Sequence, residues 1–441
     1  MIIHREETFA GKQMEELQLE RMKKTLEKVY ENVPFYKNLL DDYGIDVLKF
    51  NRLNDLTEYP FTTKEDLRKN YPFGMFAVGK EKLVRIHASS GTSGKPTVVG
   101  YTKHDIEQWS QAVARAIAMG GGKKGEVLHN AYGYGLFTGG LGLHYGSEML
   151  GMTTVPVSGG NTNRQIQLIQ DFKPAIICGT PSYTLNIAEK MESLGIAPDN
   201  NSLKYGIMGA EPWTEKMRLI LEQKLGIQAC DIYGLSEVMG PGVAMECAEG
   251  RNGLHIAEDH FIAEVVDPVT LERLEDGEEG ELVFTSLTKE AMPLIRYRTG
   301  DIASISRDAC ICGRTTARMS RIKGRIDDML IVRGVNVYPS QIEFQLLSTS
   351  EVVPHYQVFI NTSGSLDVVT LHVELNETVY KEASFSVNHA IAQTVARKIE
   401  QRLKSALMIS IRVKVCAPNT IPRSEGKAVR IIDQRKLNSY T

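Results

Sequence analysis

The chain has 441 residues, of which 42% are hydrophobic and 24% are charged, and its formal net charge is only −3. This length exceeds one ordinary core, so two or three domains are expected. The balanced charge argues against nucleic acid or an anionic membrane as a partner, and no apolar run approaches the ~20 residues of a membrane span. The charged N-terminal segment lacks the apolar centre of a signal peptide, which favours a cytoplasmic protein.

Helical and extended patterns alternate through the first half of the chain. Residues 1–45 contain apolar side chains at the three- and four-residue spacing of a helix. Between residues 100 and 230, helical stretches such as 105–120 alternate with short strands such as "AIICGT" and "YGIMGA". Strands that are apolar throughout are typical of a parallel sheet covered by helices, so this half predicts an α/β domain.

The pattern changes twice in the second half. After residue 250 the segments "HFIAEVVD", "GELVFTSL" and "DIASIS" indicate a β-rich part. From residue 327, further strands flank a long helical stretch over 385–407, in a unit of ordinary domain size. We therefore expect an α/β protein with a large domain over 1–326, built from mixed or parallel sheets, helices and the β-rich part, and a small α+β domain over 327–441.

The segment "HASSGTSGKPTVVGYT" (87–102) joins two β-prone stretches and is rich in glycine and hydroxyl side chains. Such a loop can turn backbone N–H groups and hydroxyls inward to bind an anion. The Walker A alternative fails, because only two residues separate Gly91 from Gly94 and a proline follows Lys95. A flexible surface hairpin is the alternative for this loop taken alone. The candidate anion ligands are Ser89, Ser90, Gly91, Thr92, Ser93, Gly94 and Lys95.

Five further motifs follow this loop in order. They are "GAEPW" (209–213), "DIYGLSE" (231–237), "YRTGD" (297–301), "GRIDDMLIVRGVNVYP" (324–339) and "IPRSEGKAVRI" (421–431). The series resembles the acyl-adenylate-forming superfamily over almost the whole chain. "NAYGYGLFTGGLGLHYG", "DIYGLSEVMGPGVAMEC" and "RGVNVYPSQIE" are similar to the phenylacetate–CoA ligase branch. The resemblance implies a ligase that activates a carboxylic acid with ATP and transfers the acyl group to coenzyme A, releasing AMP and pyrophosphate.

The same resemblance implies a nucleotide site. The glycine loop would hold the leaving phosphates of ATP, and Glu237 would bind Mg²⁺. Tyr233 would stack on adenine, and the Asp301 carboxylate would accept hydrogen bonds from both ribose hydroxyls. Taken alone, such charged residues would be ordinary surface groups. The other implied nucleotide contacts are Gly209, Ala210, Glu211, Pro212, Asp231, Ile232, Gly234 and Arg325.

Two residues near or in the small domain have mechanistic roles by resemblance. Lys427 would reach the attacking carboxylate and the α-phosphate, where a positive charge stabilises developing negative charge. Only the glycine–lysine pair of "RSEGK" matches the family pattern at this place. Asp327 would be the hinge about which the mobile small domain rotates between adenylation and thioester formation.

A pocket for the acid is expected at "YGYGLFTGG" (132–140). Tyr132, Tyr134 and Phe137 lie among glycines there, and small residues beside aromatic ones leave a flat slot suited to an aromatic acid. Ordinary packing of these aromatic side chains is the alternative. Nothing in the segment separates phenylacetate from benzoate, indoleacetate or a medium-chain acid.

The cysteines suggest a metal site outside the reaction. Cys310 and Cys312 lie two apart in a turn, and Cys247, His255 and His260 lie upstream. Three thiolates and one imidazole can hold a four-coordinate structural Zn²⁺. We prefer His255 to His260 as the fourth ligand because it is closer to Cys247 in the sequence. Buried free thiols are the alternative.

Two alternatives to a CoA ligase are open at this point. The acceptor of the acyl group could be a carrier protein or a flavin-type cofactor, or the chain could bind a nucleotide without catalysis. The presence of Lys427, Glu237 and Asp301 argues against a pure binder. The expected partners are a small carboxylic acid, ATP and CoA, with no nucleic acid and no membrane, and the family resemblance suggests a homodimer.

Overall fold

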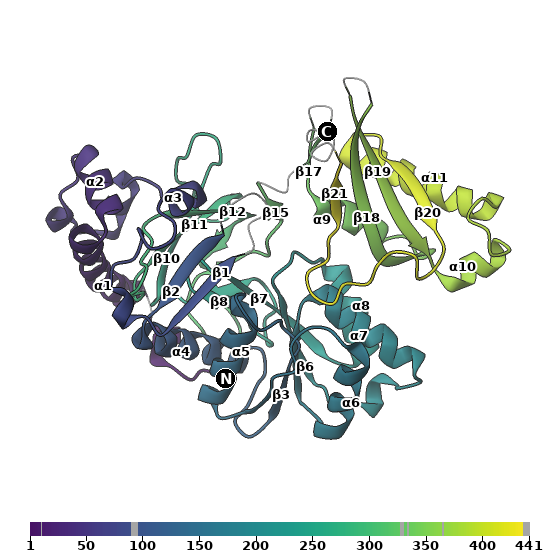
Figure 1. The fold of residues 1–441 in the computed structure, drawn as a ribbon, viewed down its shortest axis with the longest axis horizontal. Helices are drawn as coiled ribbons and strands as arrows, with labels where there is room; N and C mark the ends of the chain where they lie inside the picture. The colour runs from purple at the N-terminus through teal and green to yellow at the C-terminus, as the bar shows by residue number, and fades with distance from the viewer. Residues whose placement is uncertain (10, 90–95, 327–329, 333–334, 364–365, 435–441) are drawn as a thin grey trace. The chain divides into compact units, whose positions relative to one another are not determined.

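The fold is given by a computed structural model that describes all residues except 10, 90–95, 327–329, 333–334, 364–365 and 435–441 (Figure 1). The chain forms two compact units. Unit 1 consists of Met1–Thr180, Asp199–Ala210 and Gly226–Ile322. Unit 2 consists of Pro181–Pro198, Glu211–Leu225 and Lys323–Thr441. Two short stretches from the middle of the chain thus belong to the same unit as the C-terminal region.

A mixed β-sheet forms the centre of unit 1. Among the described residues it has nine strands in the order β13-β14-β9-β8-β7-β6-β5-β3-β4. The strands on one side, which pair in parallel, are β3 (Val127–Asn130), β4 (Thr153–Val155), β5 (Ile176–Gly179), β6 (Tyr205–Gly209) and β7 (Gln228–Leu235). The strands that continue the sheet in antiparallel pairing are β8 (Gly240–Glu246), β9 (Leu254–Ile256), β13 (Ile305–Ser306) and β14 (Arg318–Met319).

The helices of unit 1 follow the apolar spacing of the sequence. In α1 (Gly11–Asn32) the residues Met14, Met22 and Leu26 are buried on one face. A capping box starts α4 (Lys103–Met119), where the Thr102 side chain accepts a hydrogen bond from the Asp105 backbone N–H. The remaining α-helices of the unit are α2 (Pro34–Asp42), α3 (Lys64–Lys69), α5 (Thr138–Leu150) and α6 (Thr162–Phe172).

Helices α4 and α5 pack against each other and against β8 (Figure 1). This close approach needs a glycine in α5, because a Cβ added to Gly146 would lie 2.4 Å from a methyl group of Val113. The 3₁₀ helices in the described part of the chain are η1 (Arg5–Thr8), η2 (Val47–Lys49), η3 (Leu53–Glu58), η4 (Lys80–Lys82) and η5 (Pro198–Asn200). Among the helices that the structure describes, none is long and apolar enough to cross a membrane.

Two antiparallel arrangements complete unit 1. β1 (Arg85–Ser89) pairs with β2 (Thr97–Tyr101), so the glycine loop connects the strands of a hairpin, although residues 90–95 lie outside the described part. β10 (Phe261–Val266), β11 (Gly280–Ser286) and β12 (Tyr297–Ala303) pair in this order and form the β-rich part. The expected α/β fold with a β-rich part is confirmed.

Unit 2 has its own apolar core around an α+β arrangement. β18 (Val352–Ser363) and β19 (Leu366–Leu375) pair antiparallel, and β21 (Ile431–Asp433) and β20 (Arg412–Cys416) add to them in parallel. The other elements are α7 (Pro181–Ser193), α8 (Glu215–Leu225), β15 (Gly324–Arg325), β16 (Leu330–Val332), β17 (Val335–Val337), α9 (Pro339–Leu346), α10 (Glu377–Glu382) and α11 (Ala390–Leu407).

The long helix of unit 2 begins later than the sequence pattern indicated. α11 begins at Ala390 rather than at Phe385, because Ser384 and Phe385 have positive φ angles of 52° and 57°. The His389 side chain then accepts a hydrogen bond from the backbone N–H of Ile391 and caps the helix.

Candidate functional site

Three of the predicted ligand-binding segments of unit 1 lie at the carboxyl ends of its parallel strands. The aromatic segment 132–137 follows β3, Gly209 ends β6, and Glu237 follows β7. Because β6 and β7 pair in parallel, Gly209 lies opposite Ile232. Ligands of α/β sheets bind beyond these strand ends, so the order of the strands places the predicted residues where a ligand is expected.

The candidates for adenine and ribose binding touch each other. The Tyr233 hydroxyl donates a hydrogen bond of 2.7 Å to an Asp301 carboxylate oxygen, and both side chains are buried. The Tyr233 ring also stacks on Phe284, with the ring centroids 6.0 Å apart. Tyr233 comes from β7 of the nine-stranded sheet and Asp301 from β12 of the β-rich part, so this contact joins two different sheets of unit 1 at the candidate site.

The segment that ends β6 has an unusual backbone. A Cβ at Gly209 would lie 2.2 Å from the Ile232 carbonyl oxygen, so only glycine fits there. Ala210 has a φ of 69°, in the left-handed region that non-glycine residues seldom occupy. Asp231, on the next strand, lies 3.7 Å from the Arg321 guanidinium, and its backbone N–H donates to Glu246. Strained backbone of this kind is found more often at ligand-binding sites.

Glu237 is a buried carboxylate next to a cation. One of its oxygens lies 3.9 Å from the Lys64 ammonium group. Its neighbour Ser236 forms a hydrogen bond of 3.0 Å with Thr138, at the start of α5. Carboxylate oxygens are the ligands that Mg²⁺ prefers when it also binds phosphate, so Glu237 has the right chemistry for this ion.

The base of the glycine loop contacts the aromatic segment. The His87 ring nitrogen Nδ1 lies 3.0 Å from the Leu136 carbonyl oxygen, and the Ala88 N–H donates to the same oxygen at 3.1 Å. A carbonyl can only accept, so Nδ1 carries the proton. Burial lowers the pKa of His87 and favours its neutral form. The side chain of Ser89 and all of residues 90–95, including the other proposed anion ligands, lie outside the described residues.

The three candidate aromatic residues differ in their surroundings. Tyr132 is only 3% exposed and belongs to the apolar core. The Tyr134 hydroxyl accepts a hydrogen bond of 2.9 Å from Asn130 and lies 3.2 Å from the His144 ring, while burial raises its pKa. Phe137 is 36% exposed. Phe137 is therefore the aromatic residue of this segment with the most surface to offer a ligand.

Lys427 belongs to unit 2, in the stretch between β20 and β21 that has no regular secondary structure. It is exposed and lies beside a cavity of about 210 Å³. Residues of α7, of β18 and of the C-terminal stretch line this cavity, among them Ser182, Leu185, His355, Arg423 and Arg430. Arg325 and Glu211 are half-buried and Pro212 is exposed in the same unit, whereas Asp327 lies outside the described residues.

Two half-buried side chains, Glu211 and Arg430, hold the stretch that carries Lys427. The Glu211 carboxylate accepts a backbone N–H from Ser182 at 2.7 Å and another from Ala428 at 2.9 Å. Arg430 forms an ion pair of 2.9 Å with Glu343 and lies over the Tyr356 ring. Burial opposes the charge of Arg430, but Tyr356, Glu343 and Glu211 together raise its pKa. The lysine thus has an exposed side chain on a well-anchored backbone.

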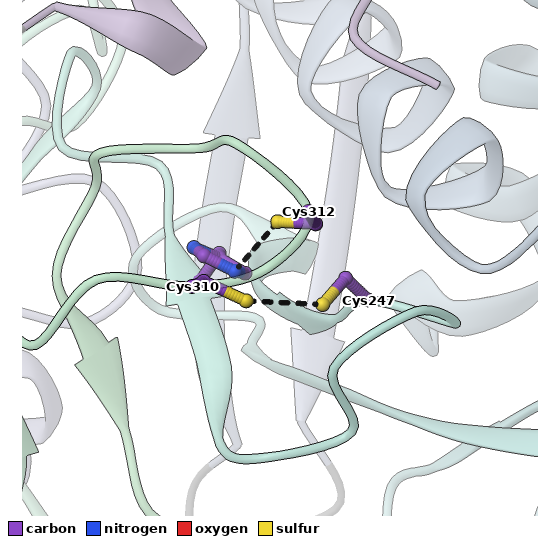
Figure 2. Close-up of side chains that lie close together, drawn as sticks. Cys247, Cys310 and Cys312 are labelled. Carbon is purple, nitrogen blue, oxygen red and sulfur yellow. Dashed lines mark hydrogen bonds between the residues drawn. The ribbon is translucent and has the colours of Figure 1, made fainter.

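The predicted metal ligands come together in unit 1 (Figure 2). The sulfur atoms of Cys247 and Cys310 are 3.6 Å apart, and the Cys312 sulfur is 3.4 Å from the His255 nitrogen Nε2. All four ligand atoms lie within 4.8 Å of one another. His260 is not in this group, because its ring contacts Thr288 and Asp259 instead.

Comparison with known proteins identifies the family. A profile of the AMP-binding enzymes matches residues 32–288, and a profile of the AMP-binding enzyme C-terminal domain matches residues 334–435. A phenylacetate–coenzyme A ligase of Thermus thermophilus is 52% identical over 442 residues, which covers 98% of each chain. The chain belongs to the phenylacetate–CoA ligase family of AMP-binding enzymes.

Solved structures of this superfamily share the fold. The crystal structure of 2-hydroxyisobutyryl-CoA ligase in the postadenylation state with 2-HIB-AMP has a TM-score of 0.92 at 28% identity, over 99% of this chain and 93% of that one. The same ligase with 2-HIB-AMP and CoA in the thioesterification state has a TM-score of 0.72 at 29% identity, over 99% and 94%. The prediction of an enzyme that forms an acyl-adenylate with ATP and transfers the acyl group to CoA is confirmed.

Sequence reasoning missed several residues of the candidate site. Lys64, His87 and Thr138 lie beside the predicted residues, and none of the three was a candidate. His87 begins the glycine-rich segment and Thr138 lies in the segment 132–140, and this position was the only signal for either residue. Lys64 is far from Glu237 in the sequence, and only the folded chain brings the two together.

Proposed function

We propose that the acid activated by this ligase is an aromatic acid of the phenylacetate type. The relative from Thermus thermophilus, which matches over 98% of the chain, is a phenylacetate–coenzyme A ligase. The half-exposed ring of Phe137 among glycines suits a flat aromatic group. The observation that carries the assignment of the nucleotide site is the buried contact between Tyr233, near the carboxyl end of β7, and Asp301 of β12.

In the first step, a carboxylate oxygen attacks the α-phosphorus of ATP and pyrophosphate leaves. Both reactants are anions, so the protein has to align them and compensate their charge. Asp301 accepts hydrogen bonds from the ribose, Tyr233 contacts adenine, and the glycine loop binds the leaving phosphates. Lys427 stabilises negative charge on the carboxylate and the α-phosphate. Glu237 would hold Mg²⁺, which would supply further positive charge at the phosphate oxygens.

In the second step, the thiol of CoA attacks the acyl carbon and AMP leaves. We assign a small domain over 327–441 that turns about Asp327 between the two steps. Two features support this assignment. The ligase for 2-hydroxyisobutyrate was solved in a postadenylation and in a thioesterification state. In this chain, the Ala428 N–H, next to Lys427, donates to Glu211, which lies outside 327–441, so this hydrogen bond would break when the small domain turns.

Three remaining features complete the proposal. Cys247, His255, Cys310 and Cys312 bind a structural Zn²⁺ that takes no part in acyl transfer. The enzyme is a homodimer, as the family resemblance suggests, and it acts in the cytoplasm. These features rest on the ligand cluster and on the sequence pattern, and none is needed for the two chemical steps.

The test is pyrophosphate release with ATP, Mg²⁺ and a panel of aromatic and aliphatic acids, with and without CoA. We expect release that requires an acid, is fastest with phenylacetate or a close aromatic relative, and gives the acyl-CoA when CoA is present. A preference for aliphatic acids would overturn the aromatic assignment. Acid-dependent release without acyl-CoA formation would contradict the assigned second step.

A further inference from the structure

The four-residue cluster is built on paired strands. Cys247 directly follows β8, and His255 lies in β9, opposite Met245 of β8 and opposite Arg318 of β14. Cys310 and Cys312 lie in the loop between β13 and β14. The strands that flank this loop, β13 and β14, pair with each other, and β14 pairs with β9, so the sheet holds both ends of the cysteine loop beside His255.

Two distances within the cluster match the edges of a tetrahedral metal site, and all four ligand atoms lie within 4.8 Å of one another. With zinc–sulfur bonds of about 2.3 Å and zinc–nitrogen bonds of about 2.0 Å, the edges of the tetrahedron are about 3.8 Å between sulfurs and about 3.5 Å between sulfur and nitrogen. The observed 3.6 Å between Cys247 and Cys310 and 3.4 Å between Cys312 and His255 agree with these lengths. A disulfide needs about 2.05 Å, so Cys247 and Cys310 are not bonded to each other.

The surroundings of the ligands also fit a metal site. The His255 nitrogen Nδ1 lies 3.1 Å from the Thr316 hydroxyl and 3.3 Å from its carbonyl oxygen, so Nδ1 carries the proton and Nε2 is left with its lone pair toward Cys312. Histidine ligands of metals are usually oriented by such a contact. The Gly250 N–H donates to the Cys247 sulfur, and a Cβ at Gly250 would lie 2.9 Å from the Cys310 sulfur.

The loop with the two cysteines also binds the N-terminal segment, residues 1–9. The buried Arg314 guanidinium forms an ion pair of 2.6 Å with the buried Glu7 carboxylate. The Thr315 N–H donates to the Glu7 carbonyl oxygen at 3.1 Å, and the Thr315 hydroxyl donates to the Phe9 carbonyl oxygen at 2.7 Å. Glu7 in turn accepts the backbone N–H groups of Ile3 and His4.

The charges of the cysteine cluster and of Arg314 are complementary, and Arg314 also binds residues 1–9. Three thiolates and one divalent cation leave one negative charge, which would be costly if it were buried alone. Arg314 follows Cys312 by two residues in the same loop, and its guanidinium pairs with Glu7, so the loop that carries the ligands also holds the N-terminal segment. The positive charge of Arg314 therefore lies near the negative cysteine cluster and also binds Glu7 of residues 1–9.

We infer that Cys247, His255, Cys310 and Cys312 hold one Zn²⁺ whose function is to fix the loop around Arg314 and thereby attach residues 1–9 to the sheet. Four sulfur and nitrogen ligands favour zinc in a closed structural site, without an open position for a substrate. This inference rests on the zinc site of the proposed function but not on which acid the enzyme activates, because its tests measure zinc and backbone protection rather than turnover.

The first test is the zinc content of the full chain, purified under reducing conditions without added metal. We expect about one zinc per chain, as in other closed four-ligand sites, and zinc–sulfur distances of about 2.3 Å by X-ray absorption. The Cys310→Ser and Cys312→Ser variants should lose the metal. Cys416→Ser is the matched control, since Cys416 is a half-buried thiol of β20 outside the cluster. A wild-type protein that contains no zinc and takes up none from solution would overturn the inference.

The second test asks what the zinc does, and it needs no variant of the cluster. Zinc is removed from the folded wild-type protein with a chelator, and amide hydrogen exchange is followed. We expect faster exchange at Ile3, His4 and Thr315 and unchanged exchange in β5. Glu7→Gln should speed exchange at Ile3 and His4 while zinc remains bound. The control is Glu6→Gln, at a less buried neighbour, which should change neither the exchange rates nor the zinc content. Unchanged exchange after zinc removal would refute the attachment role.

Discussion

The nucleotide-binding candidates of unit 1 and the Lys427 stretch of unit 2 are built in opposite ways. Tyr233 and Asp301 are buried on strands, and a direct hydrogen bond joins them. Lys427 is exposed on a stretch without regular secondary structure, whose neighbours Ala428 and Arg430 are held by side chains from elsewhere in unit 2. The buried pair suits binding of a nucleotide in one fixed geometry. The exposed lysine suits a group that acts in the first step and leaves the site in the second.

This contrast predicts different kinetic effects. A change at Tyr233 or Asp301 should weaken ATP binding. A change at Lys427, or at a group that holds its backbone, should slow adenylation and leave thioester formation intact. The two half-reactions can be measured separately, as acid-dependent pyrophosphate release and as acyl-CoA formation from supplied acyl-adenylate.

Lys427→Ala should give the largest effect. Loss of a charge aimed at the transition state should slow adenylation on the order of a thousandfold, as for other groups that stabilise developing charge. ATP affinity and the conversion of supplied acyl-adenylate should change little. Lys414→Ala, at an exposed lysine of β20, is the control. Unchanged adenylation in Lys427→Ala would remove the lysine from the mechanism.

Asp301→Ala should give the next largest effect, now on ATP binding. Two hydrogen bonds to a carboxylate are lost, so the KM for ATP should rise about a hundredfold. Tyr233→Phe keeps the ring and removes one hydrogen bond to Asp301, so we expect about a tenfold rise. Asp276→Asn, at an exposed carboxylate, is the control. A raised KM for the acid with an unchanged KM for ATP would contradict the ribose assignment.

The sequence predicted Tyr233 and Asp301 as site residues but not the contact between them. Each lies in a motif, and the apolar strands around Tyr233 predicted the parallel sheet that orients it. The hydrogen bond to Asp301 depends on how two sheets pack, which no local pattern encodes. The same holds for the cysteine cluster. Its cysteine and histidine ligands could be recognised in the sequence, but the approach of Cys247 to Cys310 depends on the pairing of β8, β9 and β14.

The contacts that hold the Lys427 stretch could not be predicted from the sequence. Glu211 lies in a motif, and the resemblance placed it beside adenine. The structure shows that both of its carboxylate oxygens accept backbone N–H groups, one of them from Ala428. Glu343 and Tyr356, which bind Arg430, belong to helix and strand patterns that look like ordinary packing. Contacts between residues so far apart in the sequence cannot be read from spacing.

Glu211→Gln tests the contacts that hold the Lys427 stretch and should have an intermediate effect on the rate of adenylation. Glutamine has one carbonyl oxygen, so it can satisfy Ser182 or Ala428 but not both, and its amide group would face the other N–H. We expect adenylation to slow about tenfold, as the cost of one unsatisfied N–H suggests, with thioester formation unchanged. Glu192→Gln, which changes an exposed pair with Lys224 in the same unit, is the control. An equal loss in both half-reactions would contradict a role specific to Lys427.

Phe137→Ala should give the smallest effect and tests the acyl end of the site. Removal of a half-exposed aromatic ring should raise the KM for phenylacetate several-fold, because a contact between aromatic rings is worth about 1 kcal/mol beyond its buried area. The KM values for ATP and for aliphatic acids should not change, since neither depends on an aromatic contact. Leu136→Ala is the control, because Leu136 is the exposed neighbour in the same loop. A uniform rise for all acids would show that Phe137 shapes the loop rather than contacting the substrate.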